Sequence, residues 1–224
     1  MIERVSTGNP KLDELLEGGF PKRSLILLAG GPGAGKTILS AKFIHGGAVK
    51  GEVGVYVCFA ESSDTFMRSM EAFGMDFRTL VEESRVAVLD LSVGTEIDVQ
   101  RCLDRILEKV TSLRAERLVI DSVTAMSVGL RSELDKRHLI HLLYNLIHKS
   151  GCTTVMITDV PWGSDRIGGG LEEFIADGII LMRGWFNSEG ALQRQLRVLK
   201  MRGVNHTKRT HEYLITKEGV AIMN

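Results

Sequence analysis

Apolar residues along this chain fall into short runs that alternate with longer amphipathic stretches. The runs are rich in valine, isoleucine and leucine and are too brief for helices, so each predicts a strand. They lie at Leu25–Ala29, Val53–Phe59, Val86–Leu91, Leu118–Asp121, Thr153–Thr158 and Ile179–Met182. The stretches between them carry one apolar face at helical spacing, near residues 37–49, 64–73, 98–113 and 133–149. This alternation predicts an α/β fold with a mainly parallel sheet flanked by helices on both faces.

The pattern changes after residue 183, where apolar and polar residues alternate as they do in strands with one solvated face. Such segments lie near 192–201, 211–216 and 220–223, with turn signals at 188–190 and 217–219. They predict C-terminal antiparallel strands on one edge of the sheet. Because we find no internal repeat, low-complexity tract or linker, we expect a single domain over residues 1–224.

Composition removes several classes of protein. The chain has 224 residues, 44% apolar and 25% charged, with 28 basic residues against 28 acidic ones, which is typical of a soluble globular domain. A protein that works on nucleic acid or on an anionic membrane usually carries a basic excess, and this chain has none overall. The sequence has no secretory signal, no membrane-length apolar span and no disulfide-like cysteine pattern. We therefore expect a cytoplasmic protein without a membrane partner, and nucleic acid is a weaker candidate.

The 24 glycines, against only 4 prolines, direct attention to one glycine-rich segment. Residues 30–37 read GGPGAGKT and fit the phosphate-binding pattern G-x-x-x-x-G-K-[ST], after a predicted strand and before a predicted helix. In such a loop the backbone N–H groups surround a phosphate, Lys36 reaches its oxygens, and Thr37 supplies a hydroxyl to Mg²⁺. The alternative is a glycine-rich turn that ends in a surface lysine. The predicted nucleotide-binding residues are Gly31, Pro32, Gly33, Ala34, Gly35, Lys36, Thr37 and Ile38.

Two carboxylates stand at predicted strand ends, where a parallel sheet opens toward its ligand. Asp121 ends the strand Leu118–Asp121, and we expect it to hold Mg²⁺ together with Thr37, although a strand-end aspartate can instead cap the next turn. Glu61 follows the strand Val53–Phe59, and a carboxylate there can deprotonate an attacking water. The alternative for Glu61 is an acid at the start of the next helix, since capping residues follow it.

These three motifs, in this order, resemble the RecA superfamily, and further segments look like the KaiC-type ATPases. The segments that carry this resemblance are residues 6–21, DSVT at 121–124, GLEEF at 170–174 and, most specifically, KMRGVNH at 200–206. The resemblance covers almost the whole chain. It implies a RecA-like P-loop NTPase core, ATP and Mg²⁺ as cofactors, and a homohexameric ring with ATP between subunits.

The resemblance also implies residues that act on a neighbouring subunit's ATP. Lys200 and Arg202 match the lysine and arginine that reach the neighbour's nucleotide, and His206 and Lys208 match positions that also approach it. Residues 183–209 hold seven basic residues against one acidic residue, so the neutral total conceals a local positive stretch. The alternative is a solvated edge strand with basic side chains.

One departure from the family leaves the function open. Relatives usually have paired glutamates after the second strand, but Ala60 stands before Glu61 here. We expect Mg²⁺-dependent ATP binding and slow ATP hydrolysis by a ring-forming switch or regulatory ATPase, whose protein partner the sequence does not name. The alternatives are a nucleotide-gated scaffold with negligible turnover and a RecA-like DNA-binding ATPase, in which Trp162 and Arg166 of the loop 159–170 would stack a base.

Overall fold

A computed structural model describes residues 2–91, 99–127, 130, 132–164, 167 and 172–223. Within these ranges nine strands form one sheet. In spatial order they are β11 (Gly219–Ile222), β10 (Thr210–Thr216), β9 (Leu192–Met201), β8 (Gly178–Phe186), β3 (Leu25–Gly30), β7 (Thr153–Asp159), β6 (Arg117–Asp121), β4 (Gly54–Cys58) and β5 (Val86–Asp90). A separate pair consists of β1 (Arg4–Val5) and β2 (Phe20–Pro21).

Strand direction divides the sheet into two parts. The strands from β8 to β5 are parallel, whereas β8, β9, β10 and β11 pair antiparallel in sequence order. This confirms the predicted fold class, a mainly parallel sheet with antiparallel C-terminal strands on one edge. β3 lies between β7 and β8, so the segment that follows it leaves from the middle of the sheet.

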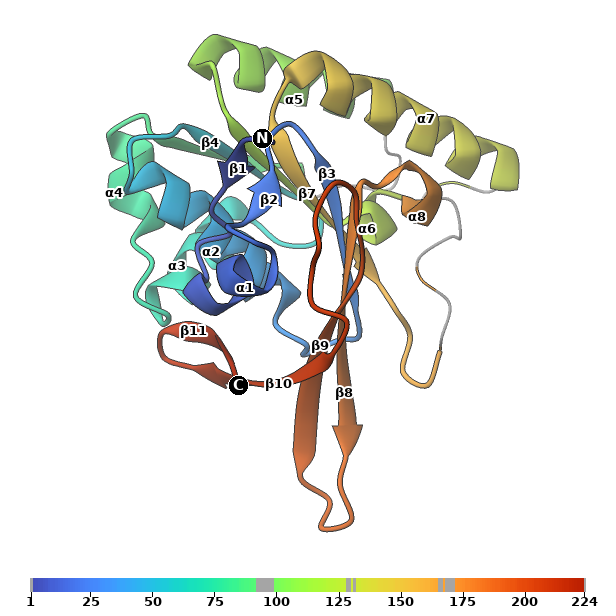
Figure 1. The fold of residues 1–224 in the computed structure, drawn as a ribbon. Helices are drawn as coiled ribbons and strands as arrows, with labels where there is room; N and C mark the ends of the chain where they lie inside the picture. Colours follow the sequence, from blue (N-terminus) through green and yellow to red (C-terminus); the bar gives the residue numbers. More distant parts are fainter. Residues whose placement is uncertain are drawn as a thin grey trace.

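Helices cover both faces of the sheet (Figure 1). They are α1 (Pro10–Leu15), α2 (Lys36–Ala48), α3 (Ser63–Glu71), α4 (Phe77–Glu82), α5 (Val99–Leu113), α6 (Val123–Ser127), α7 (Glu133–Ser150) and α8 (Glu172–Ile175). The first four pack on one face, while α5, α6 and α7 pack on the other. In β3, Ile26 and Leu28 face the first layer, whereas Leu25 and Leu27 face the second. Both faces are buried, which explains why the parallel strands read as continuous apolar runs.

Local signals determine where several elements begin and end. Ser62 accepts a hydrogen bond from the Thr65 N–H, and α3 therefore starts one residue before the prediction. β8 is longer than predicted because its outer half, beyond the end of β3, still pairs with β9. Figure 1 shows this β8–β9 hairpin extending away from the body of the molecule. Within the described ranges, no helix combines the length and apolar character needed to cross a bilayer.

Arg117, the first residue of β6, is a buried cation that joins the N-terminal segment to α2. Its side chain is only 1% exposed, and it forms an ion pair with Glu52. The guanidinium donates to the carbonyl oxygens of Ser6 at 2.8 Å and Phe43 at 2.7 Å, and it lies 4.6 Å above the Phe43 ring centroid. A buried charge is tolerated only with such partners, so this cluster makes the amino end of β6 a rigid attachment point.

We expect Arg117→Met to lower the free energy of unfolding by about 3 kcal/mol, because the N-terminal segment and α2 lose their shared donor and Glu52 loses its partner. Urea denaturation would measure the change. Arg105→Met, an equivalent change at an exposed position of α5, is the control and should stay within about 0.5 kcal/mol of wild type. Equal stability of the two variants would contradict this stabilising role of Arg117.

Candidate functional site

The glycine-rich loop turns sharply between β3 and α2. Gly33 has φ 72° and Gly35 has φ 85°, left-handed values that residues with a side chain rarely adopt. Gly35 is also the residue directly before α2, and no side chain caps that helix. The first N–H groups of a helix have no partner inside it and carry the positive end of its dipole. The loop and the start of α2 therefore offer backbone donors to an anion.

Two of the loop's carbonyl oxygens accept hydrogen bonds from the antiparallel edge of the sheet. Arg194 Nε of β9 donates to the Gly33 carbonyl at 3.1 Å. The buried Tyr213 of β10 donates its hydroxyl to the Ala34 carbonyl at 2.6 Å. These bonds fix the orientation of two peptide groups. The Ala34 N–H donates to the Gly31 carbonyl at 3.3 Å, and the Gly35 N–H is turned away from Tyr213, because the N–H of a trans peptide points away from its carbonyl. The sequence did not point to Arg194 or Tyr213 as part of the site.

Lys36, the predicted phosphate-binding lysine, is the first residue of α2. Its side chain is only 8% exposed, and Nζ donates to the carbonyls of Gly30 at 2.8 Å and Gly31 at 3.0 Å. Nζ also lies 3.0 Å from Asp159 Oδ1, which ends β7 beside Gly30. The lysine is therefore paired with a carboxylate of the chain itself.

Asp159 is itself held in place by the neighbouring strand end. Ser122 Oγ donates to its Oδ2 at 3.2 Å, and the Asp159 N–H donates to Thr124 Oγ1 at 2.8 Å. Asp159 thus connects Lys36 to Ser122 and Thr124, which follow β6. A phosphate group would have to compete with this carboxylate for the lysine.

The two residues predicted to hold Mg²⁺ are in direct contact. Thr37 Oγ1 donates to Asp121 Oδ2 at 2.8 Å, although 84 residues separate them in the chain. Burial raises the pKa of Asp121, while hydrogen bonds from Tyr56 and Thr37 act in the opposite direction. A hydroxyl and a carboxylate are oxygen ligands of the kind Mg²⁺ prefers, so the pair fits that ion. Among the described residues no group of three or more His, Cys, Asp or Glu gathers as a metal site, so this pair would rely on nucleotide and water for further ligands.

Asp121 does not cap the turn that follows it. Ser122 Oγ, not the Asp121 carboxylate, accepts the hydrogen bond from the Ala125 N–H at the start of α6. The capping alternative for Asp121 therefore has no support here.

Glu61 lies just beyond the end of β4 and is partly buried. Burial raises its pKa, and the nearby Asp121 carboxylate raises it further. A raised pKa suits a group that must accept a proton near neutral pH. Ser62, not Glu61, is the N-cap of α3, so a capping role does not explain this glutamate. Ala60, where a second glutamate would stand, is exposed.

Lys200 and Arg202 lie at the opposite end of the sheet from the glycine-rich loop. Lys200 Nζ donates to the Ala176 carbonyl at 2.6 Å, and Arg202 pairs with Asp177 Oδ1 at 3.1 Å. Asp177 Oδ2 accepts from the N–H of Leu25, the first residue of β3. From that residue to the loop, β3 spans about 16 Å, more than any side chain can bridge. The structure does not bring these two residues to the phosphate loop of their own chain.

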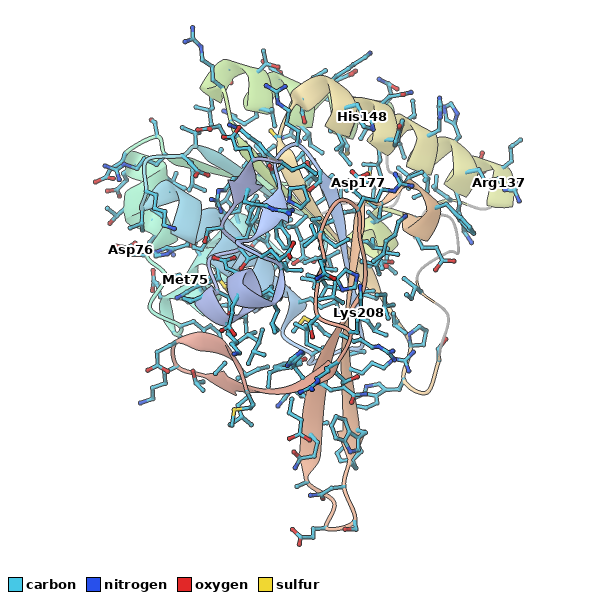
Figure 2. The ribbon with its side chains drawn as sticks, viewed as in Figure 1. Met75, Asp76, Arg137, His148, Asp177 and Lys208 are labelled. Carbon is cyan, nitrogen blue, oxygen red and sulfur yellow. The ribbon has the colours of Figure 1, made fainter. Side chains whose placement is uncertain are left out.

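His206 and Lys208 lie on the segment between β9 and β10, which runs beside α1. His206 Nδ1 is 2.7 Å from the Thr207 carbonyl oxygen, and Lys208 Nζ is 3.5 Å from His206 Nε2. The Thr207 N–H donates to the Leu15 carbonyl at the end of α1. Asp177 lies near the upper end of this segment, and Lys208 lies lower on its way to β10 (Figure 2). Among the described residues, no hydrogen bond joins His206 or Lys208 to the glycine-rich loop.

Trp162, a candidate for stacking a base, is 52% exposed but already has an aromatic partner. Its ring stacks on Phe186 of the β8–β9 hairpin, with centroids 5.9 Å apart and planes at 15°. An open cavity of about 250 Å³ lies between this tryptophan, the hairpin and Pro32 of the loop. Arg166, its proposed partner, lies outside the described residues, as do Gly170 and Leu171 of the GLEEF segment.

Comparison with known proteins agrees with this geometry. A family model described as "ATPase: KaiC" matches residues 5–224. The chain belongs to this KaiC ATPase family. The family confirms the resemblance inferred from the motifs, and it supports nucleotide binding at a general level.

Similar proteins cover the KaiC-family chain almost completely. UPF0273 proteins of Methanopyrus kandleri and Thermotoga maritima are each 36% identical over 99% of this chain and 92% and 96% of their own lengths. The crystal structure of a KaiC-like protein from Pyrococcus horikoshii has a TM-score of 0.91 and 34% identity, with both chains fully covered. The fold and the family therefore rest on full-length similarity.

We expect Asp159→Asn to tighten nucleotide binding roughly fivefold, because Lys36 loses a competing carboxylate that is half-exposed and therefore partly screened. Equilibrium titration with ATP and with ADP would measure the change. Asp90→Asn removes an exposed carboxylate from the far edge strand β5 and should leave both affinities unchanged. Weaker binding by Asp159→Asn would show that this carboxylate assists the nucleotide rather than competing with it.

Proposed function

We propose that residues 1–224 form one ATPase domain that binds ATP with Mg²⁺ and hydrolyses it slowly, at sites completed by a neighbouring copy in a homohexameric ring. The observation that carries this proposal is the position of Lys200 and Arg202 at the amino end of β3, opposite the phosphate loop. Groups placed there serve a nucleotide only on another chain. The ring, its size and slow turnover are parts of this proposal.

Within one chain, each proposed role follows from a contact. Lys36 and the backbone donors of the loop bind the phosphates once Asp159 has released the lysine. Thr37 and Asp121 hold Mg²⁺, which when bound neutralises charge on the phosphate oxygens. Glu61 accepts the proton of the attacking water, since its raised pKa makes it a stronger base than an ordinary glutamate.

The neighbouring copy supplies positive charge. Arg202 would stabilise the charge that spreads over the transferred phosphoryl group, with Lys200 beside it, and His206 and Lys208 would contact the nucleotide from the same segment. Arg202 is 61% exposed and its pair with Asp177 is weak, so the guanidinium can exchange that partner for a phosphate. A site shared in this way makes hydrolysis depend on assembly.

A nucleotide-gated scaffold with negligible turnover is the second candidate. Ala60 favours it, because one glutamate of the family's usual pair is missing and the residue in its place is exposed. In that case ATP would stabilise the ring for a protein partner without being consumed. A DNA-binding role has less support, because the net charge is zero and Trp162 already stacks on Phe186.

We expect Glu61→Gln to lower phosphate release about 10²-fold or more, because the water loses its base, while ATP affinity stays within a factor of about two. Steady-state phosphate release and equilibrium ATP binding would be measured side by side. Asp64→Asn, which removes a nearby exposed carboxylate in the first turn of α3, is the matched control.

The pH dependence provides a second readout for Glu61. The base must be ionised to act, so a raised pKa moves the acid limb of the rate profile above the ordinary glutamate value of 4.5. Unchanged turnover in Glu61→Gln would remove this assignment. Negligible turnover by the wild-type chain, with ATP-dependent assembly in light scattering, would favour the scaffold.

Shared sites can be tested by mixing two inactive variants. We expect Arg202→Ala and Lys36→Ala each to lose turnover roughly a hundredfold or more. In a mixed ring, an intact loop meets an intact arginine at about a quarter of the sites, so activity returns when the two are combined. Arg197→Ala, an exposed position on the same strand β9, is the control for Arg202→Ala and should keep its activity. Mixtures that assemble but stay inactive would contradict a site shared between copies.

A further inference from the structure

Tyr56 is a buried polar residue at the point where three functional elements meet. It lies in β4, its side chain is fully buried, and its hydroxyl donates to Asp121 Oδ2 at 2.8 Å. The same hydroxyl lies 3.0 Å from Ser40 Oγ, one turn into α2 after the phosphate loop. Its ring stacks on Phe66 of α3, the helix that follows Glu61, with centroids 4.1 Å apart.

The number of protons in this cluster limits which group can donate each hydrogen bond. An ionised Asp121 has no proton, so Tyr56 gives its single proton to that carboxylate. In its contact with Ser40 the tyrosine oxygen can then only accept, and the single Ser40 proton is shared between that oxygen and the Thr37 carbonyl at 3.0 Å. The Tyr56 hydroxyl thus lies between α2 and the Asp121 carboxylate.

Both donors to Asp121 approach the same oxygen. The Tyr56 and Thr37 hydroxyls end on Oδ2, and among the described residues no hydrogen bond reaches Oδ1. Two bonds on one oxygen fix the plane of the carboxylate and leave the other oxygen to a ligand. Groups that orient a metal ligand in this way strengthen metal binding without touching the ion.

We propose that Tyr56 is a positioning residue for the magnesium site, which orients Asp121 through its hydroxyl and joins that carboxylate to α2 and α3. This rests on the proposed function, in which Asp121 and Thr37 hold the ion. Packing alone does not require the hydroxyl, because phenylalanine would fill the same space, and a buried hydroxyl is costly unless its hydrogen bonds are made. Tyrosine supplies the hydroxyl that phenylalanine lacks.

The test separates the hydroxyl from the ring. In Tyr56→Phe, we expect the Mg²⁺ concentration for half-maximal MgATP binding to rise about 10- to 100-fold. ATP binding measured in EDTA should equal that of wild type, since the phosphate loop keeps its own donors. Phe66→Leu keeps the hydroxyl and loses the ring stacking, so it should lower the unfolding temperature while leaving the Mg²⁺ requirement unchanged.

A second variant keeps the test decisive if Tyr56→Phe folds poorly. Ser40→Ala removes the hydroxyl that contacts the Tyr56 oxygen, and it should raise the Mg²⁺ requirement in the same direction by roughly threefold. An equal Mg²⁺ requirement in both variants and wild type would overturn the role of Tyr56 and leave the proposed function standing. Wild-type ATP binding that ignores Mg²⁺ would overturn both.

Discussion

The proposed nucleotide site depends on two hydrogen bonds that hold peptide groups of the glycine-rich loop from the outside. The C=O and N–H of one trans peptide point in opposite directions, so a carbonyl held in this way turns the N–H of the same peptide away from its donor. Arg194 and Tyr213 provide these ties, and both come from the antiparallel strands rather than from the parallel core. The C-terminal strands are therefore part of the site, although they carry none of the phosphate-binding motif.

β3 connects the phosphate loop to the residues that we propose act on a neighbouring subunit's ATP. Its carboxyl end leads into the phosphate loop, and its amino end is bonded to Asp177, which pairs with Arg202. The phosphate loop and the arginine proposed to serve a neighbour are thus both attached to one strand in the middle of the sheet. A head-to-tail contact of this kind forms a closed ring when the rotation between neighbouring subunits, repeated, returns to the first subunit.

The sequence predicted the site residues that belong to a motif of fixed spacing or stand at the end of a predicted strand. Lys36, Thr37 and Asp121 follow from a motif and from a strand end. Thr37 and Asp121 are in hydrogen-bond contact, and the roles of all three stay predictions. Tyr56 and Tyr213 could not be predicted in the same way, because a buried tyrosine in an apolar strand looks like any core residue until its hydroxyl has a partner. The short helices α1, α4, α6 and α8 have four to six residues, too few for an apolar period, so only the longer helices were predicted.

The tie between Tyr213 and Ala34 has a consequence for the growing polypeptide. The two residues are 179 positions apart, so the loop sequence leaves the ribosome long before the strand that braces it. During that interval the glycine-rich loop is present, but the Ala34 carbonyl lacks this donor. Long-range contacts of this kind form late in folding because closing the intervening chain is costly. The loop therefore gains this hydrogen bond only when the last strands have formed. An incomplete chain has the glycine-rich motif but lacks the tyrosine that holds it.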